Sequence, residues 1–381
     1  MAENRPRPRV AIFYSRPFDE PYHGASVHLR TLVRFIGTSL EIVVVTPPSH
    51  SSGRYPSIDT GSLSALRFLS FGVLRALWFG WEQRKLPPEE RAQVVVGFDV
   101  YLAGLAALWA KILRAPFIYL PLDSNKEVSQ GFIARKYRGG ILRHLIRGWN
   151  ERIALSMACA IYAPSEEVYR NLTGDAIPEG KLRLLRIKRE SPRMDMDAVK
   201  RWKEEMGLNV RPGVIFLGSF LYPPNVRAFE FIRAHVAPEF AHSEIAPLFL
   251  IAGYGSEAHK SKELENLRVL GTVADLDGLL YACRVALAPL DVQGGTSGKI
   301  VDYVLHGLPV VATREAVGGV LHSRLLHVVP KNLFVATIRT LLENPVCGTA
   351  PEPDPEFVRV YTQSDDVRAF VSHVEKFVYP W

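Results

Sequence analysis

The chain has 381 residues, of which 48% are hydrophobic and 22% charged. This composition is ordinary for a soluble globular protein, and the length exceeds what one hydrophobic core usually supports, so we expect two domains. The three cysteines, Cys159, Cys283 and Cys347, lie far apart without metal or redox spacing, which argues against a structural zinc and indicates a reducing compartment.

The net charge of +7 is unevenly distributed along the chain. Residues 1–150 carry 20 Lys+Arg against 11 Asp+Glu, or +9, which leaves −2 for residues 151–381. The basic part of the chain is therefore N-terminal. Its partner could be a nucleic acid, an anionic lipid or a phosphorylated acceptor.

The chain opens with alternating strands and helices. We predict strands at 10–14 and 40–46, joined by a loop and a helix, which is a Rossmann-like opening. The apolar run behind the basic N-terminus is only Val10 to Tyr14, so we expect no signal peptide. His23 and His28 lie near the expected helix start, where a histidine is more often a cap or a packing residue than a ligand.

Two segments combine aromatic or aliphatic residues with cations. Residues 62–84 and 131–149 have the composition of interfacial helices, and the second is expected to break at Gly139–Gly140. The alternatives are an internal helix with snorkelling arginines for the first segment and a solvated helix face for the second. Val94 to Ala110 is too short to span a bilayer and is expected to form a strand, a turn and a helix.

A predicted strand at 116–120 ends just before Asp123. In this pattern Asp123 is the one acidic residue of the N-terminal half placed directly at the carboxyl end of a strand, where open α/β sheets bind ligands. It could act as a base or position an acceptor. The alternative is that it caps the following turn through Ser124 or Asn125.

A charged, proline-bearing segment at 187–200 is the expected linker. Beyond it we predict strands at 213–219, 248–255 and 269–273, and a terminal helix at 364–378.

Residues 285–319 form the most informative segment, a predicted βαβ unit with strands at 285–290 and 310–313. The intervening helix, 299–306, is expected to be two-faced and to close at Gly307 in the left-handed conformation. Its polar face would carry Lys299, Asp302, Tyr303 and His306, and its apolar face Ile300, Val301, Val304 and Leu305.

The N-terminus of this helix follows a glycine-rich turn. Gly294, Gly295 and Gly298 leave backbone N–H groups uncovered, and Ser297 or Gly298 is the expected N-cap. Such an end attracts an anion. A surface helix whose polar face meets only water is the alternative.

The segment resembles the donor-site signature of GT-B glycosyltransferases of the family 4 type. That signature has two acidic residues eight positions apart before a G-x-P-V-V-A strand; here the second is Asp302, the strand reads GLPVVAT, and Gly294 occupies the first acidic position. With Lys299, the loop is closer to a subgroup that reads G-G-x-x-x-K-x-x-E. Asp123, Ser124 and Lys126 resemble an acidic-Ser pair and lysine of the same subgroup.

The resemblance implies an α/β fold with two Rossmann-like domains facing a cleft. The N-terminal acceptor domain would span 1–190, with a C-terminal helix at 362–381 packing back on it, and the donor domain would span 191–361. The donor would be a nucleotide-sugar, which is a substrate, so no cofactor and no metal are expected. The D-x-D pairs at Asp195 and Asp275 are discounted as metal sites, because nothing else acidic is predictably close.

The resemblance also implies a set of site residues. The donor-binding residues would be Gly218, Ser219, Gly271, Thr272, Val273, Gly294, Gly295, Thr296, Ser297, Lys299 and Asp302. His23, Gly24 and Lys126 would lie on the acceptor and sugar side, with Asp123 as the catalytic carboxylate. Many family members place Arg and Lys where this chain has Ser219 and Asn225, and Arg227 is the candidate to compensate.

The expected function is transfer of a sugar from a nucleotide-sugar to a lipid-linked or glycan acceptor. The protein would be cytoplasmic and peripheral on the anionic inner face of the cytoplasmic membrane, without a nucleic-acid partner. Family resemblance implies retention of anomeric configuration, whereas a base at Asp123 would imply inversion. The alternatives are a nucleotide-sugar epimerase and a basic lipid- or nucleic-acid-binding protein with a vestigial donor site; Lys299 and Asp302 argue against the latter.

Overall fold

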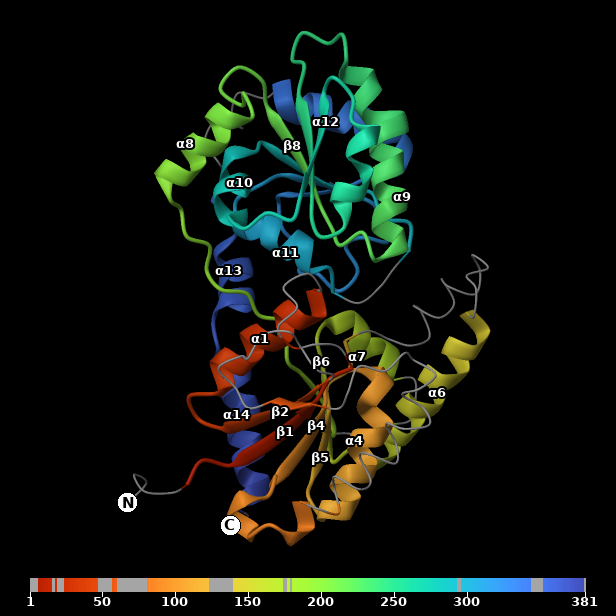
Figure 1. Ribbon diagram of the computed structural model, residues 1–381, viewed down its shortest axis with the longest axis vertical. Coiled ribbons are helices and arrows are strands. Elements are labelled where there is room, and N and C mark those ends of the chain that lie inside the picture. The colour runs from red at the N-terminus through yellow and green to blue at the C-terminus, as the bar shows by residue number, and fades with distance from the viewer. Residues whose placement is uncertain are drawn as a thin grey trace. The chain divides into compact units, whose positions relative to one another are not determined.

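The structure, a computed structural model, describes residues 6–15, 18, 24–46, 57–59, 81, 83–122, 140–173, 177–178, 180–292, 296–343 and 352–379. The chain divides into two compact units (Figure 1). Unit 1 comprises residues 1–188 and 364–381, and unit 2 comprises residues 189–363. The chain therefore passes between the units twice, between residues 188 and 189 and between residues 363 and 364.

Unit 1 is built on a parallel sheet of seven strands in the order β3-β2-β1-β4-β5-β6-β7. The strands are β1 Arg9–Phe13, β2 Glu41–Thr46, β3 Ser57–Asp59, β4 Val94–Gly97, β5 Phe117–Tyr119, β6 Ala160–Ala163 and β7 Leu182–Leu184. The helices are α1 Gly24–Ile36, α4 Val100–Leu113, α6 Gly140–Met157, α7 Glu166–Thr173 and α14 Asp365–Val378.

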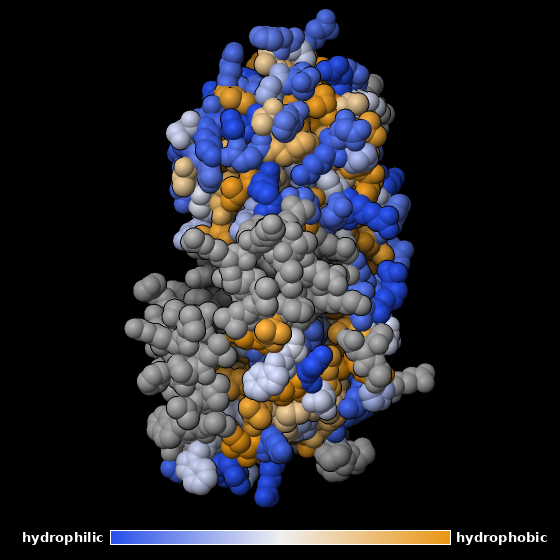
Figure 2. Space-filling model, turned by 90° about the vertical axis from the view of Figure 1, so that its right-hand side faces the viewer, coloured by the Kyte–Doolittle hydropathy of each residue, from blue (hydrophilic) through white to orange (hydrophobic). Residues whose placement is uncertain are grey.

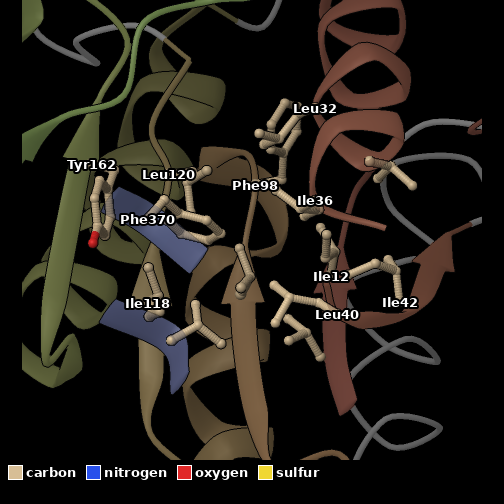
Figure 3. Close-up of a cluster of buried hydrophobic side chains, with 14 of the residues drawn as sticks. Ile12, Leu32, Ile36, Leu40, Ile42, Phe98, Ile118, Leu120, Tyr162 and Phe370 are labelled. Carbon is tan, nitrogen blue, oxygen red and sulfur yellow. The ribbon is translucent and has the colours of Figure 1, made fainter. Parts of the chain in front are cut away.

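Alternation of side chains along β1 supplies both cores of unit 1. Val10 and Ile12 pack with α1 and α14 on one face, where Figure 3 shows Phe370 of α14 beside strand residues. Ala11 and Phe13 pack with α4, α6 and α7 on the other face. Because both faces of the sheet are covered, its central strands β4, β5 and β6 are buried along their whole length. The terminal helix α14 is thus part of the core of unit 1, although it follows unit 2 in the chain.

Unit 2 contains a parallel sheet of six strands in the order β10-β9-β8-β11-β12-β13. The strands are β8 Gly213–Leu217, β9 Leu248–Ala252, β10 Leu267–Gly271, β11 Val285–Ala288, β12 Val310–Ala312 and β13 Leu326–Val328. The helices are α8 Met196–Glu205, α9 Pro223–Phe231, α10 Leu276–Ala282, α11 Gly298–Leu305, α12 Phe334–Glu343 and α13 Pro355–Thr362.

The linker prediction was wrong for its second half, because α8 begins at Met196. Asp195 is the N-cap of this helix and accepts hydrogen bonds from the backbone N–H groups of Asp197 and Ala198. Ala198 and Val199 are buried, so the packing of these residues stabilises a helix whose other residues are mostly charged. The strands β3, β7 and β13 were not predicted, since Asp59, Arg183 and His327 leave them without an apolar run.

The predicted interfacial segments lie largely outside the described residues. Of 62–84, only 81 and 83–84 are described, and they are helical. The segment 131–149 is described from Gly140, where α6 begins, next to the expected break. Among the described helices, none has the length and apolar character needed to cross a membrane.

Candidate donor site

The strand order of unit 2 identifies where a ligand should bind. The order reverses between β8 and β11, because β8 continues to β9 and β10 on one side and β11 to β12 and β13 on the other. In open parallel sheets, ligands bind at the carboxyl ends of the two strands that flank this reversal. The two segments concerned are the turn after β8 and the loop from β11 to α11 (Figure 1).

Glycine is required in the turn after β8. An added Cβ at Gly253 would collide with the carbonyl oxygen of Gly218, and Gly253 has φ +132°, which L side chains rarely adopt. An added Cβ at Gly218 would lie 2.6 Å from Cγ of Asn225. The two glycines thus let the ends of β8 and β9 approach closely, with the Asn225 amide packed against them.

Lys299 extends from the first turn of α11 to this amide. Its Nζ donates to Oδ1 of Asn225 at 2.6 Å and lies 4.6 Å from the ring centroid of Phe216, while Nδ2 of Asn225 donates to the carbonyl of Ser219 at 2.8 Å. Loss of solvent around the ammonium lowers the pKa of Lys299 to about 7. Lys299 therefore brings a cation to the turn where the family usually has Arg and Lys.

Two hydroxyl groups at this place lack a hydrogen-bond partner among the described residues. They are Oγ of Ser219 and Oγ1 of Thr296, both inaccessible to solvent. Ser297 is the N-cap of α11, as predicted, but its side chain makes no capping hydrogen bond. Because buried hydroxyls and helix N-termini seek acceptors, the arrangement suits an anionic oxygen ligand. Gly294 and Gly295 lie outside the described residues.

Asp302 forms an ion pair that the sequence did not predict. Nε of Arg189 donates to its Oδ1 at 2.7 Å, and the Arg189 side chain is 8% exposed against 25% for Asp302. For Oδ2, the described residues provide no hydrogen-bond partner. A carboxylate bound in this way keeps one oxygen for the hydroxyl groups of a ligand.

The polar face of α11 does not meet only water, which was the alternative interpretation of its sequence. Tyr303 and His306 are buried, and the Tyr303 hydroxyl accepts from the backbone N–H of Leu217 at 2.6 Å. Nε2 of His306 lies 3.0 Å from Oδ1 of Asp277 on α10. The polar groups of this face are thus paired inside unit 2. Gly307 adopts the predicted left-handed conformation, with φ +73°.

Arg227 does not replace the missing cations of the turn. Its Nε and Nη2 bind both carboxylate oxygens of Asp291, each at 2.8 Å, in a bidentate pair. Asp291 lies three residues beyond the end of β11, so this pair ties the loop between β11 and α11 to α9.

Gly271, Thr272 and Val273 lie at the carboxyl end of β10. Gly271 has φ +77°, and its carbonyl accepts from the backbone N–H of Gly253 at 2.8 Å. The strand ends two residues earlier than the 269–273 prediction. The three residues are thus joined to the turn after β8 through Gly253.

In unit 1, the strand order reverses between β1 and β4. Gly24 is the first residue of α1, and an added Cβ there meets nothing within 4 Å. His23, Asp123 and Lys126 lie outside the described residues, so their roles stay predictions. His28 is buried and packs against Phe98.

Asp123 is not the one acidic residue at the carboxyl edge of this sheet. Asp99 lies two residues beyond β4, directly at the strand reversal, and is 4% exposed. Its carboxylate accepts from the backbone N–H groups of Ser15 at 2.6 Å and of Tyr101 and Leu102 at 2.8 and 3.0 Å. Burial raises the pKa of Asp99. Sequence analysis missed it because the apolar run beyond 94–96 obscured the end of β4.

The D-x-D pairs lie at helix N-termini. Asp195 is the N-cap of α8, and Asp275 is the N-cap of α10 and accepts from the N–H of Gly278 at 3.1 Å. The described residues contain no group of three or more His, Cys, Asp or Glu that could hold a metal ion.

Residues 211–344, which run from β8 through α12, match the family model described as glycosyl transferases group 1. The chain is a glycosyltransferase of the GT-B fold. In this nucleotide-sugar glycosyltransferase the matched segment contains both sides of the strand reversal in unit 2. No curated protein matches the sequence of the chain.

Solved structures of glycosyltransferases share the fold of the whole chain at low sequence identity. Sucrose-phosphate synthase from Thermosynechococcus elongatus has a TM-score of 0.74 and 15% identity, with 98% of this chain and 99% of that one covered. Anabaena HepE, in complex with UDP-glucose, has a TM-score of 0.70 and 12% identity, with 98% and 100% covered. WaaG, which is involved in lipopolysaccharide biosynthesis, has a TM-score of 0.68 and 16% identity, with 98% and 100% covered.

Proposed function

We propose that this glycosyltransferase binds its nucleotide-sugar at the carboxyl ends of β8 and β11 and transfers the sugar to a lipid-linked or glycan acceptor at an anionic membrane surface. One observation supports the donor part most strongly. Lys299 donates from Nζ to Asn225, and the hydroxyls of Ser219 and Thr296, which belong to the same two loops, are buried and have no partner among the described residues. Such an arrangement suits a diphosphate.

The remaining donor groups have complementary roles in this proposal. Asp302 accepts ribose hydroxyls, and the backbone of 271–273 contacts the base, while the loop at 294–297 surrounds the diphosphate. Anabaena HepE was solved with UDP-glucose, which supports a nucleoside diphosphate sugar as the class of ligand. We propose Asp123 as the residue that positions or deprotonates the acceptor. No metal or cofactor is required, because Lys299 and the N-terminus of α11 balance the charge of the leaving diphosphate.

A panel of nucleotide-sugars tests the donor part. We expect one or more of the UDP-, GDP- and dTDP-sugars to raise the melting temperature, because a ligand at 100 times its dissociation constant adds about 2.7 kcal/mol to the free energy of unfolding. With the stabilising donor, a transferase releases nucleoside diphosphate only when an acceptor is added. An epimerase converts the donor sugar without an acceptor. A panel in which no nucleotide-sugar shifts the melting temperature contradicts the proposed site.

The membrane part rests on charge and on exposed apolar side chains. Leu145 and Trp149, four residues apart on one face of α6, are 61% and 62% exposed, and Trp81 is 56% exposed. Figure 2 looks onto the side of unit 1 that carries α4 and α6, where apolar side chains lie among hydrophilic ones. Arg147 does not contribute as predicted, because it is 6% exposed and lies over the Tyr101 ring.

Vesicle sedimentation tests the membrane part. We expect the protein to sediment with vesicles of phosphatidylglycerol at low salt and not with phosphatidylcholine, since each Lys or Arg near an anionic surface contributes about 1 kcal/mol. Replacing Leu145 and Trp149 together by Glu should reduce the bound fraction severalfold. Val210→Glu, at an 89% exposed position of unit 2, is the control. Equal sedimentation with both lipids would remove the electrostatic contribution.

A further inference from the structure

The loop between β11 and α11 is bound near both of its ends to the same helix, α9. Near its start, the carboxylate of Asp291 accepts two hydrogen bonds from Arg227, which lies in the second turn of α9. Just past its other end, in the first turn of α11, Lys299 donates from Nζ to Oδ1 of Asn225 at 2.6 Å. Asn225 lies in the first turn of α9. One short helix therefore holds the chain on both sides of this loop.

The pair between Arg227 and Asp291 has a defined geometry. Its two hydrogen bonds are both 2.8 Å long, and the two side chains are 32% and 18% exposed. A planar guanidinium that binds both oxygens of a carboxylate fixes the orientation of the two groups as well as their distance. Partial burial also reduces the screening of their attraction by salt. The pair therefore restrains the start of the loop more than an exposed ion pair would.

The residues just before Asp291 are held by a different contact. Thr313, directly after β12, is 4% exposed and donates from Oγ1 to the carbonyl oxygens of Ala288 at 3.4 Å and of Leu290 at 2.5 Å. This contact continues the pairing of β11 with β12. It fixes the end of β11 but belongs to the sheet. Asp291 is the position at which α9 binds the chain that leaves β11.

The helix α9 is also continuous with the other side of the strand reversal in unit 2. It begins at Pro223, four residues after Ser219, in the turn that follows β8. Nδ2 of Asn225 donates back to the carbonyl of Ser219 at 2.8 Å. The turn after β8 and the loop after β11 are thus connected through α9. A ligand that contacts both segments binds more tightly when their spacing is already fixed, because it does not have to order them.

We propose that Arg227 is a positioning residue for the donor. Through Asp291 it holds the loop between β11 and α11 at the distance from the turn after β8 that a diphosphate requires, and it does so without contacting the donor. This role differs from that of the cation expected to compensate for Ser219 and Asn225. The inference rests on the proposed donor site, and it assigns to α9 the task of keeping the two sides of that site together.

A mutant cycle tests whether Arg227 acts through Asp291. UDP, GDP and dTDP are titrated by calorimetry into wild type, Arg227→Gln, Asp291→Ala and the double variant. For the nucleoside diphosphate that binds wild type, we expect each single variant to weaken binding about tenfold, which is the scale of ordering the backbone of one further residue. The double variant should bind no more than about threefold more weakly than either single variant, because both changes remove the same restraint.

The matching nucleoside, measured by competition, separates positioning of the diphosphate from a general effect on unit 2. We expect its binding to change less than about threefold in all three variants, because a nucleoside has no phosphates that need the loop in place. An equal loss for nucleoside and nucleoside diphosphate would mean that the pair stabilises unit 2 as a whole, and would overturn the inference.

Two further variants control for the loss of an arginine. Arg233 lies in the π-helical turn that continues α9, and its pair with Glu230 has similar exposure, 34% and 33%. Arg233→Gln should therefore bind the nucleoside diphosphate like wild type. Arg227→Lys keeps the charge but loses the bidentate geometry, so its loss should be smaller than that of Arg227→Gln. It replaces Arg227→Gln in the cycle if that variant does not fold.

The remaining outcomes separate this inference from the proposed function. If the losses of the two single variants add up to about a hundredfold in the double variant, the two residues act independently and the inference fails. A loss in Arg227→Gln without one in Asp291→Ala would indicate that Arg227 contacts the donor directly, and unchanged binding in both would remove any role. If wild type binds none of the three nucleoside diphosphates, the proposed donor site itself fails, and the role of Arg227 fails with it.

Discussion

Lys299→Met is expected to weaken binding of the nucleotide-sugar about tenfold to a hundredfold, roughly 1.5–3 kcal/mol. The ammonium makes a charge-assisted hydrogen bond to Asn225 and lies over the Phe216 ring, where a diphosphate would gain a cation with little solvent around it. Methionine keeps an unbranched apolar stem against the ring while removing the charge. Calorimetric titration of wild type and variant measures the change.

The same lysine should make donor binding depend on pH. Burial lowers the pKa of Lys299 to about 7, so in the ligand-free protein the ammonium is present below pH 7 and is lost as the pH rises above it. If the donor binds the ammonium form, its affinity is highest below pH 7 and falls by up to about tenfold per pH unit above it. A nucleotide-sugar has no phosphate proton that titrates in this window, so the change reports on the protein.

Lys299→Met is its own control, because its affinity should not vary between pH 7 and 9. A wild-type dissociation constant that stays constant over this range would contradict a role for the Lys299 ammonium in binding. A variant that loses affinity and keeps the wild-type pH dependence would assign the titration to another group.

Asp366→Asn is expected to lower the free energy of unfolding of unit 1 by about 3 kcal/mol. Oδ1 of Asp366 lies 2.7 Å from Nζ of Lys188, whose side chain is 2% exposed, and Oδ2 accepts from the backbone N–H of Arg186 at 3.0 Å. The variant leaves a buried ammonium without its carboxylate. Urea unfolding followed by circular dichroism measures the effect.

The pH dependence of this effect has a defined sign. Burial lowers the pKa of Lys188 below its usual 10.5, although Asp366 opposes the shift. Between the pKa of Lys188 in the folded protein and 10.5, the unfolded chain binds more protons than the folded one. The destabilisation caused by the buried Lys188 ammonium is therefore complete below the folded pKa and decreases as the pH rises towards 10.5. Asp366→Asn removes the charge that opposes this shift, so the pKa of Lys188 should fall further. The free energy of unfolding of the variant should then increase with pH over a wider range than that of wild type.

Two variants test the interpretation of the Asp366 result. Combining Asp366→Asn with Lys188→Met should recover part of the stability, because no buried charge remains. Asp365→Asn, which breaks an exposed pair with Arg368 on the same helix, should change the stability by less than about 1 kcal/mol. If Asp365→Asn destabilises as much as Asp366→Asn, the effect belongs to the start of α14 and not to the buried pair.

Much of the fold could be predicted because its elements carry local signals. The apolar runs of β1, β8 and β11 and the glycine at 307 identify parallel strands and the end of α11 without knowledge of tertiary contacts. The resemblance to family 4 then indicated which loop would bind a donor. The strand β13 and the helix α8 were missed, because His327 interrupts the first and charged residues make up most of the second.

For the candidate site, the sequence predicted which residues lie on the loops after β8 and β11, but not which groups these residues contact. Lys299 was expected on the polar face of α11 together with Tyr303, and the structure shows that the Tyr303 hydroxyl lies inside unit 2, at the end of β8. A period of 3.6 shows that a helix has two faces; it does not show whether the polar one meets water or other polar groups. Arg227 was a candidate cation until the structure placed it against Asp291.

The sequence by itself determined most of the strands and helices, the presence of two domains and which loop is proposed to bind the donor, because these depend on hydrophobic period, glycine and proline at neighbouring positions. Only the tertiary structure decided the partners of the charged residues. Lys299 meets Asn225 across 74 positions, and Asp302 meets Arg189 across 113. Such pairs are made by packing distant segments together, and a polar residue shows no local sign of which distant group will satisfy its hydrogen bonds.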